Sequence, residues 1–386
     1  MKKVFWIIFF ISFSIASAQN VEKTIIVKDV ATNLPIEDAV IMIMKTKQII
    51  ITNKEGKGTF ILKSASNIQV SHASFNKINF RSTTLNKNET VILLRNGLND
   101  LDELIITKQP QKILKNLIEN SKRRLTIPAR LKVYGREFFK LNGKYAYYND
   151  GLINFQIFGK TKKFDSNILV EQNRSFGLLD QEVSVDLLGY NLNDIMENYY
   201  NFKYLNSILE SSAKKDYTFV LRVLTKNKQY NVFKITPNEN MKGLLDEYSI
   251  VYEPKSNTVV SVTTDLRPEI IAKNIKKTGI GSKNIYKSFF QATYRNDNEG
   301  YYLLSSKEEI GFEKIDKKQT KTLEVRNYFV TNNFSTQNYS FNESDVFKDK
   351  TLFNKKNLII TDYWNVSGLT ATAEEELILK EIENRD

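Results

Sequence analysis

Short runs of β-branched and aromatic residues recur about every ten residues early in the chain, and this spacing constrains the fold most strongly. Turn-forming residues separate the runs, at Asn33 with Pro35, at 53–58 and at 86–88. Strands this short, joined by turns, are typical of an all-β sandwich. We therefore predict an all-β sandwich over residues 19–95. Its strands are expected at 24–27, 39–43, 48–52, 59–62, 68–71 and 90–94.

A second series of strand-like runs follows and is longer. Asn142-Gly143, between the runs 132–141 and 144–149, is a strong hairpin signal because both residues tolerate positive φ. We predict a larger curved antiparallel sheet or open barrel of roughly nine strands over 128–345, with a helical insertion at 178–212. The later strands are expected at 217–223, 229–235, 243–252, 258–264, 285–294, 301–310 and 320–330.

A linker of residues 96–127 joins these two β-regions. Pro110 can open a helix at its first turn, and the apolar residues that follow fall on one face. These are Ile113, Leu114, Leu117, Ile118 and Leu125. Three basic residues near the helix C-terminus suit the helix dipole; the alternative is contact with phosphate headgroups. They are Lys122, Arg123 and Arg124.

The tail, residues 346–386, is predicted to contain a second helix. Thr370 or Thr372 can cap it, and its first turn is acidic, which suits the positive end of the helix dipole. Trp364 is expected to pack the tail onto the sheet.

The first eighteen residues have the pattern of a secretory signal peptide. Lys2 and Lys3 precede an apolar run at 4–15, and the small residues Ala16 and Ala18 predict cleavage before Gln19. The apolar run is shorter than the roughly 20 residues that span a bilayer, although a retained signal anchor is the alternative. We expect the chain to reach the periplasm, the periplasmic face of an outer membrane, or the exterior.

The order of residues in the N-terminal region resembles the carboxypeptidase-like regulatory domain. The matching positions are Val27-Lys28-Asp29, Thr32, Pro35-Ile36, Ala39-Val40, Thr52-Asn53, Gly56 or Gly58, Phe60, Val70-Ser71-His72 and Phe75. Two positions depart from the family pattern, namely Ile26, where a glycine is common, and Ser74-Phe75, where the family has Gly-Tyr. The resemblance implies a transthyretin-like, immunoglobulin-like sandwich that is an accessory module and carries no peptidase chemistry.

Two further segments are similar to those of Bacteroidota envelope proteins that carry this module. The stretch 101–107 is similar to a linker that often leads to a TonB-dependent receptor, and the Trp364…Leu369-Thr370 ending is similar to other tails of this group. No receptor follows here, because the remaining chain is too short for a barrel of about 22 strands. The larger β-region weakly resembles periplasmic lipoprotein carriers of the LolA/LolB type, in topology alone.

The net charge and the absence of cysteine limit the ligands and partners expected for the chain. The formal net charge is +12, from 56 Lys plus Arg and 44 Asp plus Glu. A basic exported protein can meet anionic lipid headgroups, lipopolysaccharide or acidic glycans; the alternative is compositional drift. No block of like charges suggests nucleic-acid binding. The absence of cysteine excludes disulfides and thiolate metal sites, and the sequence predicts no cofactor and no oligomeric state.

The catalytic inventory of the sequence is sparse. His72 is the single histidine, and the neighbouring Ser71 faces the other side of the same strand, so the two cannot begin a Ser-His-Asp triad. One histidine is also too few for a histidine-based zinc site. Carboxylates at Asp150, Asp246-Glu247 and Glu308-Glu309 could serve a glycosidase, but nothing in the sequence brings two of them together. We therefore predict no catalytic, cofactor-binding or metal-binding residues.

Three functions remain open from the sequence. The first is a non-enzymatic exported envelope protein that binds a partner or an apolar ligand. Its candidate partners are an envelope protein and a lipid or glycan ligand, with peripheral contact to a membrane as an option. The second is a structural adaptor that docks an outer-membrane machine. The third is a carboxylate-dependent glycan hydrolase. A deep apolar cavity under the larger sheet would favour carriage of an apolar ligand, and a filled core would favour an adaptor.

Overall fold

The computed structural model divides the chain into two compact units. The first comprises Met1–Asn96 with Thr361–Thr372, and the second comprises Gly97–Ile360 with Ala373–Asp386. The predicted signal peptide and Trp364 lie outside the described residues. The structure describes residues 21–97, 103–105, 109–159, 164–177, 191–223, 230–238, 246–266, 275–278, 281–316, 319–337, 340–352, 355, 357–359 and 368–383.

The first unit is the predicted β-sandwich. Its two sheets have the strand orders β4-β1-β7 and β3-β2-β5-β6. Inward-facing Ile25, Ile41 and Phe60 are fully buried between them, as alternation along each strand requires. The strands are β1 (Val21–Asp29), β2 (Val40–Ile43), β3 (Gln48–Ile51), β4 (Lys57–Leu62), β5 (Asn67–His72), β6 (Phe75–Arg81) and β7 (Glu89–Leu94), with the 3₁₀ turn η1 (Ser82–Thr84).

A short piece of the C-terminal tail also belongs to the first unit. Leu369 forms a parallel bridge with Ile51. The Thr370 hydroxyl accepts a hydrogen bond from the Thr59 amide at 2.9 Å, and Asn53 donates to the Ala371 carbonyl at 3.2 Å. The tail predicted as one segment is thus divided, because residues from Ala373 onward belong to the second unit.

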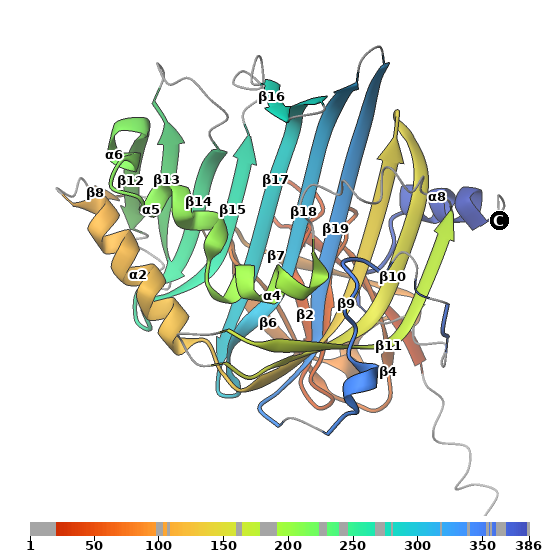
Figure 1. Cartoon of the computed structure of the whole chain (residues 1–386). Helices are drawn as coiled ribbons and strands as arrows, with labels where there is room; N and C mark the ends of the chain where they lie inside the picture. Colours follow the sequence, from red (N-terminus) through yellow and green to blue (C-terminus); the bar gives the residue numbers. More distant parts are fainter. Residues whose placement is uncertain are drawn as a thin grey trace, which may run out of the picture. The chain divides into compact units, whose positions relative to one another are not determined.

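The second unit is built on one large sheet of twelve strands. Its order is β11-β10-β9-β19-β18-β17-β15-β14-β13-β12-β8, with β16 paired to β17, and the sheet stays open with β11 and β8 at its edges (Figure 1). This confirms the predicted curved antiparallel sheet. The strands are β8 (Glu103–Ile105), β9 (Ala129–Leu141), β10 (Lys144–Ile157), β11 (Ser166–Gly177), β12 (Tyr217–Val223), β13 (Asn231–Pro237), β14 (Asp246–Glu253), β15 (Thr258–Leu266), β16 (Ile275–Thr278), β17 (Gly281–Asp297), β18 (Gly300–Asp316) and β19 (Gln319–Ser335).

Helices cover one face of the large sheet, which we call the helix-covered face (Figure 1). Leu114, Leu117 and Ile118 of the linker helix belong to the same buried cluster as Val133 and Phe155 of the sheet. The described part of the predicted insertion is helical and adds to this cluster. The helices are α2 (Pro110–Arg124), α4 (Leu192–Tyr200), η2 (Lys203–Leu205), α5 (Asn206–Leu209) and α6 (Ala213–Asp216).

The opposite side of the sheet, which we call the charged face, carries polar and aromatic side chains. The C-terminal helix α8 (Ala373–Glu383) packs on it, with Ile378 and Ile382 against Phe138 and Tyr148. The segment after β19 covers the edge strand β11 through bridges from Leu169 to Val346 and from Asn173 to Leu358. Such cover removes the exposed strand edge that would otherwise invite pairing with another chain.

Candidate functional site

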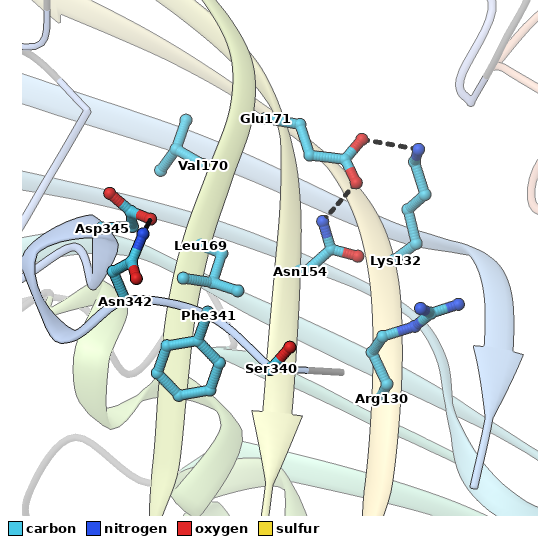
Figure 2. A pocket seen from close by; sticks show the side chains of 10 residues that line it. All are labelled: Arg130, Lys132, Asn154, Leu169, Val170, Glu171, Ser340, Phe341, Asn342 and Asp345. Carbon is cyan, nitrogen blue, oxygen red and sulfur yellow. Dashed lines mark hydrogen bonds and ion pairs between the residues drawn. The ribbon is translucent and has the colours of Figure 1, made fainter. Parts of the chain in front are cut away.

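A pocket of about 830 Å³ lies where strands β9, β10 and β11 meet the segment that covers the sheet edge (Figure 2). Most of its strand residues point from the charged face, and the 3₁₀ turn η3 (Glu343–Asp345) contributes to its outer wall. Its walls are formed by Arg130, Lys132, Asn154, Leu169, Val170, Glu171, Ser340, Phe341, Asn342 and Asp345.

A β-bulge places the central carboxylate of this pocket. Leu152 pairs with Gln172, but the next residue, Ile153, pairs with Val170, which leaves Glu171 as the extra residue of β11. A bulge of this kind redirects a side chain. Glu171 consequently reaches Lys132 Nζ at 2.6 Å and accepts a hydrogen bond from Asn154 Nδ2 at 2.6 Å (Figure 2).

The outer wall comes from residues 340–345, which precede the bridge between Val346 and Leu169. Asn342 donates a hydrogen bond to the Asp345 carboxylate at 3.2 Å. Phe341 lines the same wall and is half-buried. The formal charges of Arg130 and Lys132 balance those of Glu171 and Asp345, so the pocket is rich in fixed hydrogen-bonding groups without a strong net charge.

A buried carboxylate, Asp150, organises the charged face beside the pocket. It is fully buried and accepts hydrogen bonds from the hydroxyls of Tyr134 at 2.9 Å and Tyr148 at 2.5 Å. Arg174 adds two more, at 3.0 and 2.6 Å. Burial, with smaller effects from neighbouring charges, raises the pKa of Tyr134 to about 12. Among the described residues, the hydrogen-bond partners of Asp150 lie on β9, β10 and β11, so this candidate from the sequence joins three strands.

A second ionic network holds helix α8. Glu375 lies between Arg136 at 3.3 Å and Arg326 at 3.7 Å, and both the Glu375 and Arg136 side chains are almost fully buried. Arg326 also approaches Glu309 at 3.6 Å, and Lys287 reaches Glu309 at 2.6 Å. Burial alone would raise the pKa of Glu309, but the Lys287 hydrogen bond and the nearby cations lower it to about 2.

The remaining predicted carboxylates do not form a pair. Glu308 and Glu309 point to opposite faces of the sheet, and Asp246 lies three strands away from Glu308 along the sheet order. Burial raises the pKa of Glu308 to about 7. Burial and then the charge of Asp265 raise the pKa of Asp246 to about 6. The structure therefore separates the acid and base considered for a glycosidase.

His72 and the basic helix end have local partners. The His72 Nδ1 atom accepts a hydrogen bond from the Ser74 amide at 3.0 Å, and burial lowers the pKa of the ring to about 4. The three basic residues Lys122, Arg123 and Arg124 form the last turn of α2, and Lys122 pairs with Glu119 at 3.1 Å. Among the described residues, no three acidic or histidine side chains gather as metal ligands.

The sequence did not predict that the residues around Glu171 would form a pocket. Arg130, Lys132 and the more distant Arg136 alternate along one strand, which signals a polar sheet face, but nothing in the sequence marks Glu171 as a bulge residue. Strand β11 itself was absent from the predicted set because its polar residues break the apolar alternation.

The helix-covered face is filled by side chains. Leu192, Met196 and Tyr200 of α4 are buried in the cluster that includes sheet residues Ile153 and Phe233. Over the part of the sheet that the structure describes, packed helices occupy the place where an apolar ligand would lie. None of the described helices is both long and apolar enough to cross a membrane.

Comparisons with known proteins give little support to any assignment. No protein family profile matches the chain, and no curated protein matches its sequence. Among solved structures, a chain described under lipid–protein interactions in lipovitellin aligns with a TM-score of 0.26 and 11% identity. The alignment covers 62% of this chain but 28% of the lipovitellin chain, and a similarity this low carries no argument about function.

Proposed function

We propose that this chain is a non-enzymatic, exported cell-envelope protein whose second unit binds a hydroxyl-rich ligand of the glycan class. The observation that carries the proposal is the pocket around Glu171, with its fixed carboxylates, amides and cations beside the ring of Phe341. The predicted signal peptide and the resemblance of residues 19–95 to an accessory envelope module support the location.

The chemistry of the pocket suits a glycan better than a fatty acid. Sugar hydroxyls both donate and accept hydrogen bonds, and the pocket offers carboxylate acceptors with amide and cationic donors. An aromatic ring such as Phe341 can pack against the apolar C–H face of a sugar. Ligand sites combine apolar walls with a few placed polar groups in this way. Over the residues that the structure describes, helices α2 and α4 pack against the helix-covered face, which favours a polar ligand in the pocket over an apolar ligand beneath these helices.

The structural adaptor is the second candidate, and the same filled face favours it. In that case the N-terminal sandwich would dock a partner while the large sheet provides a rigid body. Co-purification from envelope fractions would detect such a partner. A protein that leaves those fractions as a lone species would count against the adaptor.

Glycan binding can be tested by substitution at the bulge. We expect Glu171→Gln to weaken binding of an envelope oligosaccharide about tenfold, because a charged acceptor for hydroxyl groups is lost. Calorimetric titration with peptidoglycan fragments and with the lipopolysaccharide core oligosaccharide would measure it.

The chain offers a matched control for this experiment. Glu324 has a similar exposed fraction, 31% against 34% for Glu171, and also pairs with a lysine of β9, Lys140, outside the pocket. Glu324→Gln should bind as the unchanged protein does. Equal loss in both variants, or no saturable binding of either oligosaccharide, would refute the proposal.

A further inference from the structure

A row of polar side chains crosses the helix-covered face and plays no part in the pocket. Glu308, Asn327, Glu137 and Asn149 are successive cross-strand partners on β18, β19, β9 and β10. Directly paired residues project from the same face of a sheet. We call these four residues the acceptor row.

The acceptor row contains more hydrogen-bond acceptors than donors. Asn149 donates to Glu137 at 2.5 Å, but its own Oδ1 atom and that of Asn327 are buried and accept no hydrogen bond within the described structure. The two asparagines are 1% and 3% exposed. Buried polar atoms without a partner cost about 1–3 kcal/mol each, so they are normally satisfied by water or a ligand.

Glu308 ends the row beside an aromatic wall. Its cross-strand partner is Phe290, whose ring stacks on Tyr199 with centroids 5.8 Å apart and contacts Tyr204 at 4.3 Å. Tyr199 belongs to α4, which passes in front of the central strands (Figure 1). Glu308, Phe290 and Tyr204 are half-buried, so this end retains access from solvent.

Among the described residues, no cation contributes to the pKa of the Glu308 carboxylate. In the part of the chain that the structure describes, burial alone raises the pKa of this carboxylate. A buried carboxylate is stable in its ionised form only when a positive charge or hydrogen-bond donors approach it. The aromatic faces of Phe290 and Tyr199 attract the same kind of group, because the π face carries negative charge.

We propose that the Glu308 end of the acceptor row binds a primary ammonium group. The cation lies against Phe290 and Tyr199, pairs with Glu308, and donates N–H bonds to Glu308 and to the Asn327 Oδ1 atom. The unpaired amide oxygen selects a primary amine over a quaternary ammonium, since the latter has no N–H to donate. Free amines, ethanolamine headgroups and lysine side chains share this chemistry.

Calorimetric titration of the purified protein with small probes tests the site. At pH 8 we expect n-butylammonium to bind at least tenfold more tightly than tetramethylammonium or n-butanol. Ethanolamine and Nα-acetyl-lysine amide, compared in the same way, distinguish a headgroup source from a side-chain source. Equal binding of n-butylammonium and n-butanol would overturn the proposal, and equal binding of tetramethylammonium would remove the role of Asn327.

Two variants and a control make the test specific. Glu308→Gln should weaken n-butylammonium binding at least tenfold, and Phe290→Leu severalfold, because it keeps an apolar side chain but loses the π face. Glu313→Gln is the control: Glu313 lies on the same strand, is half-buried, and points to the charged face. Unchanged binding in Glu308→Gln, or an equal loss in Glu313→Gln, would overturn the site.

Discussion

Glu308 and Glu309 are adjacent in sequence, and their environments shift their pKa values in opposite directions. Burial without a partner raises the pKa of Glu308 to about 7. Glu309 meets Lys287, Lys307 and Arg326 on the other face, and these cations outweigh burial and lower its pKa to about 2. Because side chains alternate along a β-strand, Glu308 faces the side where no described cation affects its pKa and Glu309 faces the side with three cations, so burial destabilises the charge of Glu308 while ion pairs stabilise that of Glu309.

The raised pKa of Glu308 predicts a pH-dependent loss of stability. Its favourable contribution is complete below its ordinary value of 4.5 and disappears as the pH rises through about 7, because the folded protein must then hold an unpaired charge. Glu308→Gln removes that charge. We expect the variant to gain about 1–3 kcal/mol in free energy of unfolding relative to the unchanged protein between pH 5 and pH 8. Urea denaturation at both pH values measures this, and a pH-independent difference would contradict the prediction.

At the scale of elements, local chemistry explains which parts the sequence could predict. Asn142 and Gly143 both adopt positive φ, 50° and 77°, and form the expected hairpin between β9 and β10. Periodicity likewise predicted most of the sandwich strands and most of the α2 apolar face, although Ile113 of that face is exposed. Strand β11 and the bulge at Glu171 were not predicted, because the polar residues of β11 break the apolar alternation and the bulge depends on the register of its pairing with β10.

The Asp150 side chain links β9, β10 and β11, so we expect its removal to lower the stability of the protein strongly. Asp150→Ala should lower the free energy of unfolding by about 3–5 kcal/mol, since it leaves Arg174 partly buried without its carboxylate and two tyrosine hydroxyls without an acceptor. Tyr148→Phe removes one hydroxyl and should cost about 1–2 kcal/mol. Urea denaturation measures the loss in free energy of unfolding for both variants. An equal loss in Asp150→Ala and Tyr148→Phe would show that Asp150 does not organise the network.

At the scale of the whole molecule, the tail serves both units in succession. Residues 368–372 add hydrogen bonds to the sandwich, through Leu369 beside Ile51 and Thr370 beside Thr59. Helix α8 then adds Glu375 and two buried isoleucines to the large sheet. The sequence predicted the helix but not this division, because nothing local marks the point at which the chain passes from one unit to the other.

Two truncations separate these contributions. A chain that stops after Thr372 loses only α8, which leaves Arg136 buried without Glu375, so amide hydrogen exchange should accelerate in β9 and β10 while β3 and β4 keep their protection. A chain that stops after Ile360 also loses the hydrogen bonds at Thr59 and Asn53, so β3 and β4 should exchange faster as well. Mass spectrometry of exchanged peptides measures both regions in one experiment. If the two truncations change β3 and β4 equally, residues 361–372 do not stabilise the sandwich.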